Sequence, residues 1–288
     1  MSKHRRMKLL GYEFSYGVLF LRLPNVVEVG LDFNLAELKE WKFWRAVIAE
    51  LLGSMFFLYF TVSTIAYRTD FTQPSKGKEL SSSDQALATN IGSLGASAQL
   101  MIAAQFGAFI AVMVYVLAPV SGGHVNPAIT FSLAVVKKVT LVRAVCYIAA
   151  QVGGAIIGTL IAASPDHGAF MAAGGAINGS TKYSARALFV PELMATALLL
   201  SVVSAAIDST RAATVIHIGA LGPLAIGMAV FVAHLALIPL DGCSINPARS
   251  MGPAVVFGSW RQHWVFWAGP GVGGVVAAIS YEIFLRAR

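Results

Sequence analysis

The sequence has very little charge. Only 12% of its 288 residues are Asp, Glu, Lys or Arg, whereas an average soluble domain carries about a quarter. Hydrophobic residues make up 57% of the chain. This composition excludes an ordinary soluble domain and favours a protein that lies in a membrane along most of its length.

Chemistry-bearing residues are also scarce or scattered. The two cysteines, Cys146 and Cys243, fall within or beside apolar segments, which excludes a disulfide framework. The six histidines are dispersed, and no nucleophile–base set or metal-ligand spacing is present, so we expect no enzyme, metal or cofactor. The net charge of +7 is not gathered into an aromatic-rich basic patch, so we expect no nucleic-acid partner.

What the chain does have is long apolar runs. A helix needs about 20 apolar residues to cross the hydrocarbon core, and six stretches qualify. Two shorter pieces cannot cross and are predicted to be re-entrant half-helices. Residues 1–43 are interpreted as an N-terminal arm and residues 44–288 as one membrane domain. The predicted spans are 44–66, 87–118, 141–163, 187–207, 218–240 and 264–285, and the half-helices are 127–136 and 247–257.

Basic residues indicate the orientation of this domain. An even number of spans places both termini on one side of the membrane, and 14 of the 21 Lys and Arg residues fall on that side. Because loops rich in Lys and Arg stay in the cytoplasm, both termini are predicted to be cytoplasmic.

The two halves of the chain resemble each other at an offset of 120 residues. Gly107 matches Gly227, and the run Asn126-Pro127-Ala128 matches Asn246-Pro247-Ala248. Repeat one is predicted to cover residues 44–163 and repeat two residues 185–288. Three spans are an odd number, so the second copy enters the membrane upside down. The predicted fold is all-α, with six transmembrane helices, two re-entrant half-helices and an inverted repeat.

Each Asn-Pro-Ala run predicts the start of a half-helix. Asn is a favoured N-cap and Pro fits the first helical position. A helix N-terminus carries free N–H groups and about half a positive charge. A neutral molecule that donates and accepts hydrogen bonds could pass two such ends, while a cation would be repelled. One copy could be a mere turn, but two copies at the shared offset argue against that interpretation.

At this point the chain resembles a known family. The runs SGGHVNPA (121–128) and INPARS (245–250) resemble the aquaporin, or major intrinsic protein, family. Segments 37–38, 43–46 and 284–287 look most like the plasma-membrane intrinsic proteins of plants and algae. The resemblance implies a multi-pass plasma-membrane protein in the lipid bilayer, a homotetramer with one pore in each subunit, and a water-selective channel that conducts water in single file.

The resemblance also implies an outer constriction formed by Phe106, His234, Cys243 and Arg249. The residues themselves support two of these positions, because ionisable side chains inside spans are candidates for function. Arg249 follows the start of a half-helix, where the helix dipole makes a cation unfavourable. A cation kept at such a position indicates a functional role. Bulky Phe106 and His234 should admit water but hardly glycerol. Cys243 should face the pore, which would let a thiol-binding metal block it.

Two carboxylates, Glu50 and Glu192, lie inside predicted spans at related positions of the two repeats. A proton relay is one interpretation of such groups. The family resemblance favours another, in which each carboxylate accepts backbone N–H bonds from a re-entrant loop and holds the loop in shape.

Four residues are candidates for gating, through resemblance to the plant members. His217 matches a pH-sensing His, and Leu221 matches the plug of the loop after the fourth span. Thr140 occupies the place of a phosphorylated Ser, and an unmodified surface Thr is the alternative. Glu37 keeps one acidic N-terminal anchor, but Asn34 replaces the other, which puts gating by divalent cations and protons in doubt.

Two other function classes stay open on sequence. A coupled secondary transporter also uses inverted repeats and broken helices, and a structural junction protein could carry a poorly conducting pore. Within the channel class, glycerol, hydrogen peroxide and carbon dioxide are possible additional solutes.

Overall fold

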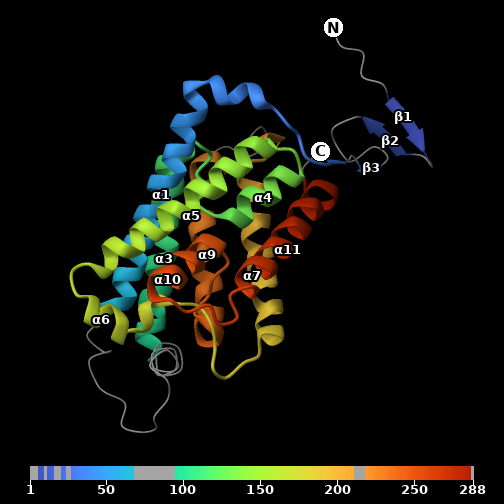
Figure 1. The fold of residues 1–288 in the computed structure, drawn as a ribbon. Coiled ribbons are helices and arrows are strands. Elements are labelled where there is room, and N and C mark those ends of the chain that lie inside the picture. The colour runs from blue at the N-terminus through green and yellow to red at the C-terminus, as the bar shows by residue number, and fades with distance from the viewer. Residues whose placement is uncertain are drawn as a thin grey trace.

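The protein is a bundle of helices in which two short helices are enclosed by longer ones (Figure 1). The structure is a computed structural model, and it describes residues 6–9, 12–15, 21–23, 27–67, 95–210 and 218–286. Within these residues, six helices are long and apolar enough to cross a membrane. This confirms the predicted number of spans.

The six long helices follow the apolar runs closely. α1 begins three residues before the predicted start, and α3 begins at Ala96, so residues 87–94 of the second predicted span lie outside the described residues. The last span ends in a π-helical turn, in which the Arg286 N–H donates to the Tyr281 carbonyl at 2.8 Å. The helices are α1 Trp41–Ala66, α3 Ala96–Leu117, α5 Leu141–Ala163, α7 Ala185–Ala206, α9 Ile218–Asp241 and α11 Val265–Ser280, with the π-helical turn Tyr281–Leu285.

The two half-helices are α4 Pro127–Val135 and α10 Pro247–Phe257. Each has an Asn as its N-cap and Pro in its first turn, as the sequence predicts. α10 ends at Gly258, whose left-handed backbone (φ +79°) suits a glycine C-cap. Local chemistry therefore sets the starts of both half-helices and the end of α10.

The inverted repeat is visible in the way helices pack through glycine. α1 packs on α5 where Gly154 and Gly158 lie against the α1 backbone, and α7 packs on α11 in the same way at Gly273. Between the repeats, α3 crosses α9 where Gly107 and Gly227 lie against each other. Small residues at these crossings let helix backbones approach closely, as membrane helix pairs require.

Shorter elements lie at the two ends of the helix bundle. One face holds the 3₁₀ helix Leu35–Lys39 and the π-helical turn Tyr281–Leu285, and the opposite face holds α6 His167–Ala172 and the 3₁₀ turn Gly174–Ala176. Two short antiparallel hairpins in the N-terminal arm were not predicted. They pair β1 Arg6–Leu9 with β2 Tyr12–Ser15, and β3 Leu21–Leu23 with β4 Val27–Val29.

Candidate functional site

The starts of the two half-helices meet inside the bundle. The Asn126 side-chain NH₂ donates to the Ile245 carbonyl at 2.8 Å, and the Asn246 side-chain NH₂ donates to the Val125 carbonyl at 2.8 Å. Each Asn Oδ1 also accepts an N–H of its own half-helix, from Ala128 and Ala248 respectively. An Asn amide carries two N–H donors, so each keeps one N–H beyond this reciprocal link.

Glu50 lies below the first re-entrant loop and is completely buried. Its two carboxylate oxygens accept the backbone N–H groups of His124 at 3.0 Å and Val125 at 2.6 Å. The Ser121 hydroxyl (2.6 Å) and the Gln151 amide (2.7 Å) donate to the same carboxylate. Four donors thus surround this buried charge, as a buried carboxylate requires.

Glu192 occupies the matching place under the second loop and is also completely buried. It accepts the backbone N–H groups of Ser244 at 2.6 Å and Ile245 at 2.7 Å. Val125 and Ile245 both have positive φ (48° and 49°), which is costly for a β-branched residue. The two carboxylates therefore hold strained turns that aim the Asn side chains.

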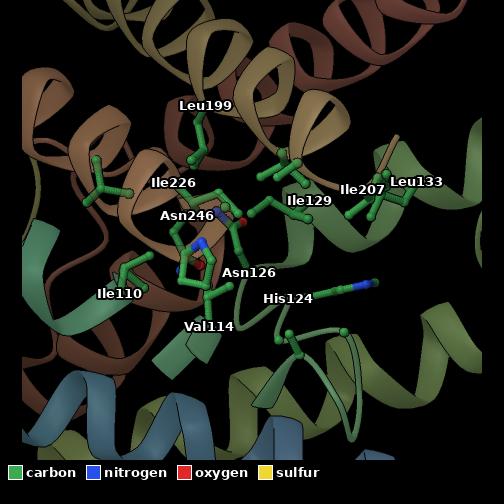
Figure 2. A pocket seen from close by; sticks show the side chains of 18 of the residues that line it. Ile110, Val114, His124, Asn126, Ile129, Leu133, Leu199, Ile207, Ile226 and Asn246 are labelled. Carbon is green, nitrogen blue, oxygen red and sulfur yellow. The ribbon is translucent and has the colours of Figure 1, made fainter. Parts of the chain in front are cut away.

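A cavity of about 220 Å³ leads from the face that holds the 3₁₀ helix Leu35–Lys39, past Lys138 and Val139, to the two Asn side chains and His234. Its walls are mostly aliphatic, and Figure 2 shows Asn126 and Asn246 next to each other among them. An apolar wall offers no competing hydrogen bonds, so a molecule in the cavity meets its polar partners at the Asn pair. Lining residues include Ile110, Val114, Ile129, Leu199 and Ile226.

Beyond His234, three of the four residues of the predicted outer constriction lie together, and all four are buried. The ring centroids of Phe106 and His234 lie 4.2 Å apart, and the Arg249 guanidinium carbon lies 5.2 Å from the Phe106 ring centroid. Phe106, His234, Cys243 and Arg249 are each at most 2% exposed.

Hydrogen bonds fix one side of the Arg249 guanidinium. Nη1 donates to the Ala176 carbonyl at 2.7 Å and to Asn178 Oδ1 at 2.8 Å, and Nη2 donates to the Gly242 carbonyl at 3.4 Å. Among the described residues, the buried Arg249 Nε and His234 Nε2 have no hydrogen-bond partner. A water molecule at this place could serve as the hydrogen-bond partner of both nitrogens, since buried polar groups are normally hydrogen-bonded.

The candidate gating residues lie at the other face. The Thr140 hydroxyl donates to Glu37 and caps α5, and Arg143 Nη2 forms a 2.7 Å ion pair with Glu37. Leu221 is 58% exposed and does not line the cavity, and His217 lies outside the described residues. Thr140 is therefore placed against a carboxylate as well as beside the basic side chain of Arg143.

Several supporting residues were missed from the sequence. Asn178 holds Arg249 from a loop that no periodicity singles out. Asp208, after α7, accepts hydrogen bonds from Thr210 and from Tyr281 of the π-helical turn. Burial raises the pKa of this carboxyl, but these hydrogen bonds and the charge of Arg286 outweigh it and hold the pKa below its ordinary value. The position of Asp208 directly after a predicted span was the sequence signal that could have singled it out.

Comparisons with known proteins agree with this geometry. The sequence pattern of the major intrinsic protein family matches residues 37–281. A probable aquaporin PIP2-5 of Arabidopsis thaliana is 42% identical over 259 residues, covering 88% of this chain and 86% of that protein. An aquaporin of PIP type from Atriplex canescens is 41% identical over 259 residues, covering 88% and 85%.

A solved structure supports the fold alone. The aquaglyceroporin from Plasmodium falciparum superposes with a TM-score of 0.66 at 22% identity, covering 84% of this chain and 97% of that one. Sequence identity to the two plant proteins is about twice as high, and the alignments cover most of both chains. The chain therefore belongs to the major intrinsic protein family, the aquaporins.

Proposed function

We propose that this protein is a membrane channel that conducts water passively, in single file, and excludes protons and other ions. The observation that carries the proposal is the reciprocal link between Asn126 and Asn246 at the end of an apolar cavity. The relatives named as aquaporins support the same function.

The Asn pair supplies the inner part of the mechanism. Water turns its oxygen toward the free N–H groups of Asn126 and Asn246, and both of its hydrogens then point along the file, away from the pair. The N-termini of α4 and α10 face the same point with partial positive charge. A cation meets this field without its hydration shell, and a proton cannot hop through a file that reverses direction there.

The outer constriction supplies the selection by size and charge. Phe106 and His234 leave little space between their rings, and Arg249 adds a fixed cation and donors. Water can satisfy the free nitrogens of His234 and Arg249 as it passes, whereas glycerol is too wide for the space. We therefore propose that water is the main solute.

The outer surface of the bundle supports a place in the bilayer. Ile48, Leu52, Phe56 and Phe60 follow one another at four-residue spacing on α1, and all are exposed. Such apolar rows require lipid or another protein surface. We propose a homotetramer in the plasma membrane with both termini in the cytoplasm, in line with the distribution of Lys and Arg.

Gating is a further part of the proposal. Glu37 joins the N-terminal segment to Thr140 and Arg143 near the mouth of the cavity. A phosphate on Thr140 would repel the carboxylate of Glu37 and break the hydrogen bond that links the N-terminal segment to Thr140. Leu221 adjoins Gly222 and Pro223, which line the cavity, so a shift of this segment would carry its side chain toward the mouth.

The proposal predicts fast water flow and slow glycerol flow in the same vesicles. Purified protein is reconstituted into proteoliposomes, and shrinkage after an osmotic step is followed by stopped-flow light scattering, with sucrose or glycerol as the osmolyte. Mercury is expected to abolish the fast water phase because Cys243 lies in the constriction. Equal permeation of glycerol and water would overturn the selectivity that we assign to Phe106 and His234.

Two cysteine variants separate the possible targets of mercury. Cys243→Ser is expected to keep the fast water phase and to resist mercury. Cys146→Ser is the matched control, because Cys146 is a free, partly buried cysteine on α5 away from the constriction; it should stay sensitive. If Cys146→Ser were the resistant variant, Cys243 would not face the water path.

A further inference from the structure

The internal repeat reveals a carboxylate where the first copy has a hydroxyl. At the offset of 120 residues, Ser121 corresponds to Asp241. Ser121 Oγ accepts the Gly123 N–H at 3.1 Å and donates its own hydrogen to Glu50 at 2.6 Å. Asp241 Oδ1 accepts the Cys243 N–H at 3.0 Å in the same way. The second loop therefore carries an acidic group at the position where the first loop has a neutral hydroxyl.

This carboxyl group is buried and incompletely paired. Asp241 has no exposed surface, and among the described residues its Oδ2 has no hydrogen-bond partner. A buried carboxylate is costly unless an opposite charge compensates it. The structure offers one such charge nearby, the guanidinium of Arg249.

A short path connects the two residues. Asn178 donates from its side-chain NH₂ to the Asp241 carbonyl at 3.2 Å, and its Oδ1 accepts from Arg249 Nη1 at 2.8 Å. Arg249 Nη2 also reaches the carbonyl of Gly242, the next residue after Asp241. Glu192, which accepts the N–H groups of Ser244 and Ile245, is completely buried beside the same loop. Arg249 therefore stands against two buried carboxylates.

We propose that Asp241 is a further specificity-determining residue of the channel, whose carboxylate offsets the charge of Arg249 and sets how strongly the outer constriction rejects cations. The inference rests on the role proposed above for Arg249. With Asp241 in place, the outer constriction repels cations less strongly than the charge of Arg249 alone would, and the Asn pair adds to the exclusion. With Asp241 neutralised, the outer barrier to cations becomes higher.

A double-mutant comparison isolates the charge of Asp241. Proton flux is measured in proteoliposomes with an entrapped pH-sensitive dye under a potassium diffusion potential, beside water flow in the same preparation. Arg249→Ser leaves Asp241 and Glu192 without their cation and is expected to raise proton flux. Adding Asp241→Asn should then lower that flux roughly tenfold, because it removes a buried negative charge that would attract cations to the constriction.

Control variants separate charge from shape. Asp241→Asn keeps the acceptor for the Cys243 N–H, and Asp241→Ser copies the arrangement of Ser121, so the second variant serves if the first fails to fold. Asp166→Asn removes an exposed negative charge from the N-cap of α6, and in the Arg249→Ser background it should leave proton flux unchanged.

The outcomes distinguish this inference from the role of Arg249. A lower flux in Arg249→Ser with Asp241→Asn or Asp241→Ser, and unchanged flux with Asp166→Asn, supports the inference. Raised flux in Arg249→Ser that neither Asp241 variant lowers overturns the inference and leaves the role of Arg249 intact. If Arg249→Ser with normal water flow leaks no protons, the outer constriction sets no charge selectivity, and both proposals fail.

Discussion

Glu50→Gln is expected to remove most of the water flow and to destabilise the protein strongly. Two carboxylate oxygens now accept four donors, from Ser121, His124, Val125 and Gln151. A Gln has one acceptor oxygen, and its NH₂ would face N–H groups that also need an acceptor. Breaking a buried, hydrogen-bonded charge network typically costs about 3–5 kcal/mol. Thermal unfolding in detergent and stopped-flow water flow measure the two effects.

Glu40→Gln is the matched control for this variant. Glu40 is exposed at the start of α1 and caps the helix without a side-chain hydrogen bond. It should keep the unfolding temperature and the water flow of the parent protein. If Glu50→Gln behaved like Glu40→Gln, the first re-entrant loop would not depend on this carboxylate, and another group would have to hold the turn at Val125.

Gly154→Leu is expected to separate α1 from α5. A Cβ at Gly154 would overlap the backbone carbonyl of Leu51, which no change of side-chain rotamer can relieve. Overpacking a tight contact costs about 1–3 kcal/mol, and more where the backbone must move. Because α5 also packs on both half-helices, the displacement should reach the site. A lower unfolding temperature together with reduced water flow is the expected result.

The neighbouring residue provides a control with the same chemistry. Gly153 lies one position earlier on α5, and a Cβ there would meet nothing within 4 Å. Gly153→Leu should therefore keep both stability and water flow, since its side chain would point away from α1. Equal destabilisation by the two variants would show that helix propensity or expression, rather than the α1–α5 contact, decides the outcome.

The sequence was sufficient for the parts that depend on local chemistry. Spans follow from apolar runs, since hydrocarbon leaves the backbone no partner except its own helix. The half-helices follow from the Asn cap and the Pro of their first turn, and the inverted repeat follows from the odd number of spans in each copy. These features need no knowledge of distant contacts. Their boundaries agree with the structure within a few residues, except at the start of the second span, where the helix begins at Ala96 rather than at residue 87 and residues 87–94 lie outside the described residues.

The support of Arg249 could not be predicted in the same way. Asn178 holds its guanidinium from 71 residues away in sequence, in a loop without periodicity. The closed contact between Phe106 and His234 depends on the crossing of α3 and α9 at Gly107 and Gly227, which a sequence does not place in space. The difference at Asp241 becomes clear only when its hydrogen-bond partners are compared with those of Ser121, the matching residue of the first repeat.

The central claim is that two oppositely inserted helix starts pass water and refuse protons at the same point. Parallel measurement of osmotic water flow and proton flux on one preparation of proteoliposomes tests it most directly. The account predicts water flow far above that of protein-free vesicles, with proton flux close to that of protein-free vesicles. Proton flux that rose in proportion to water flow, or water flow no faster than through lipid alone, would contradict it.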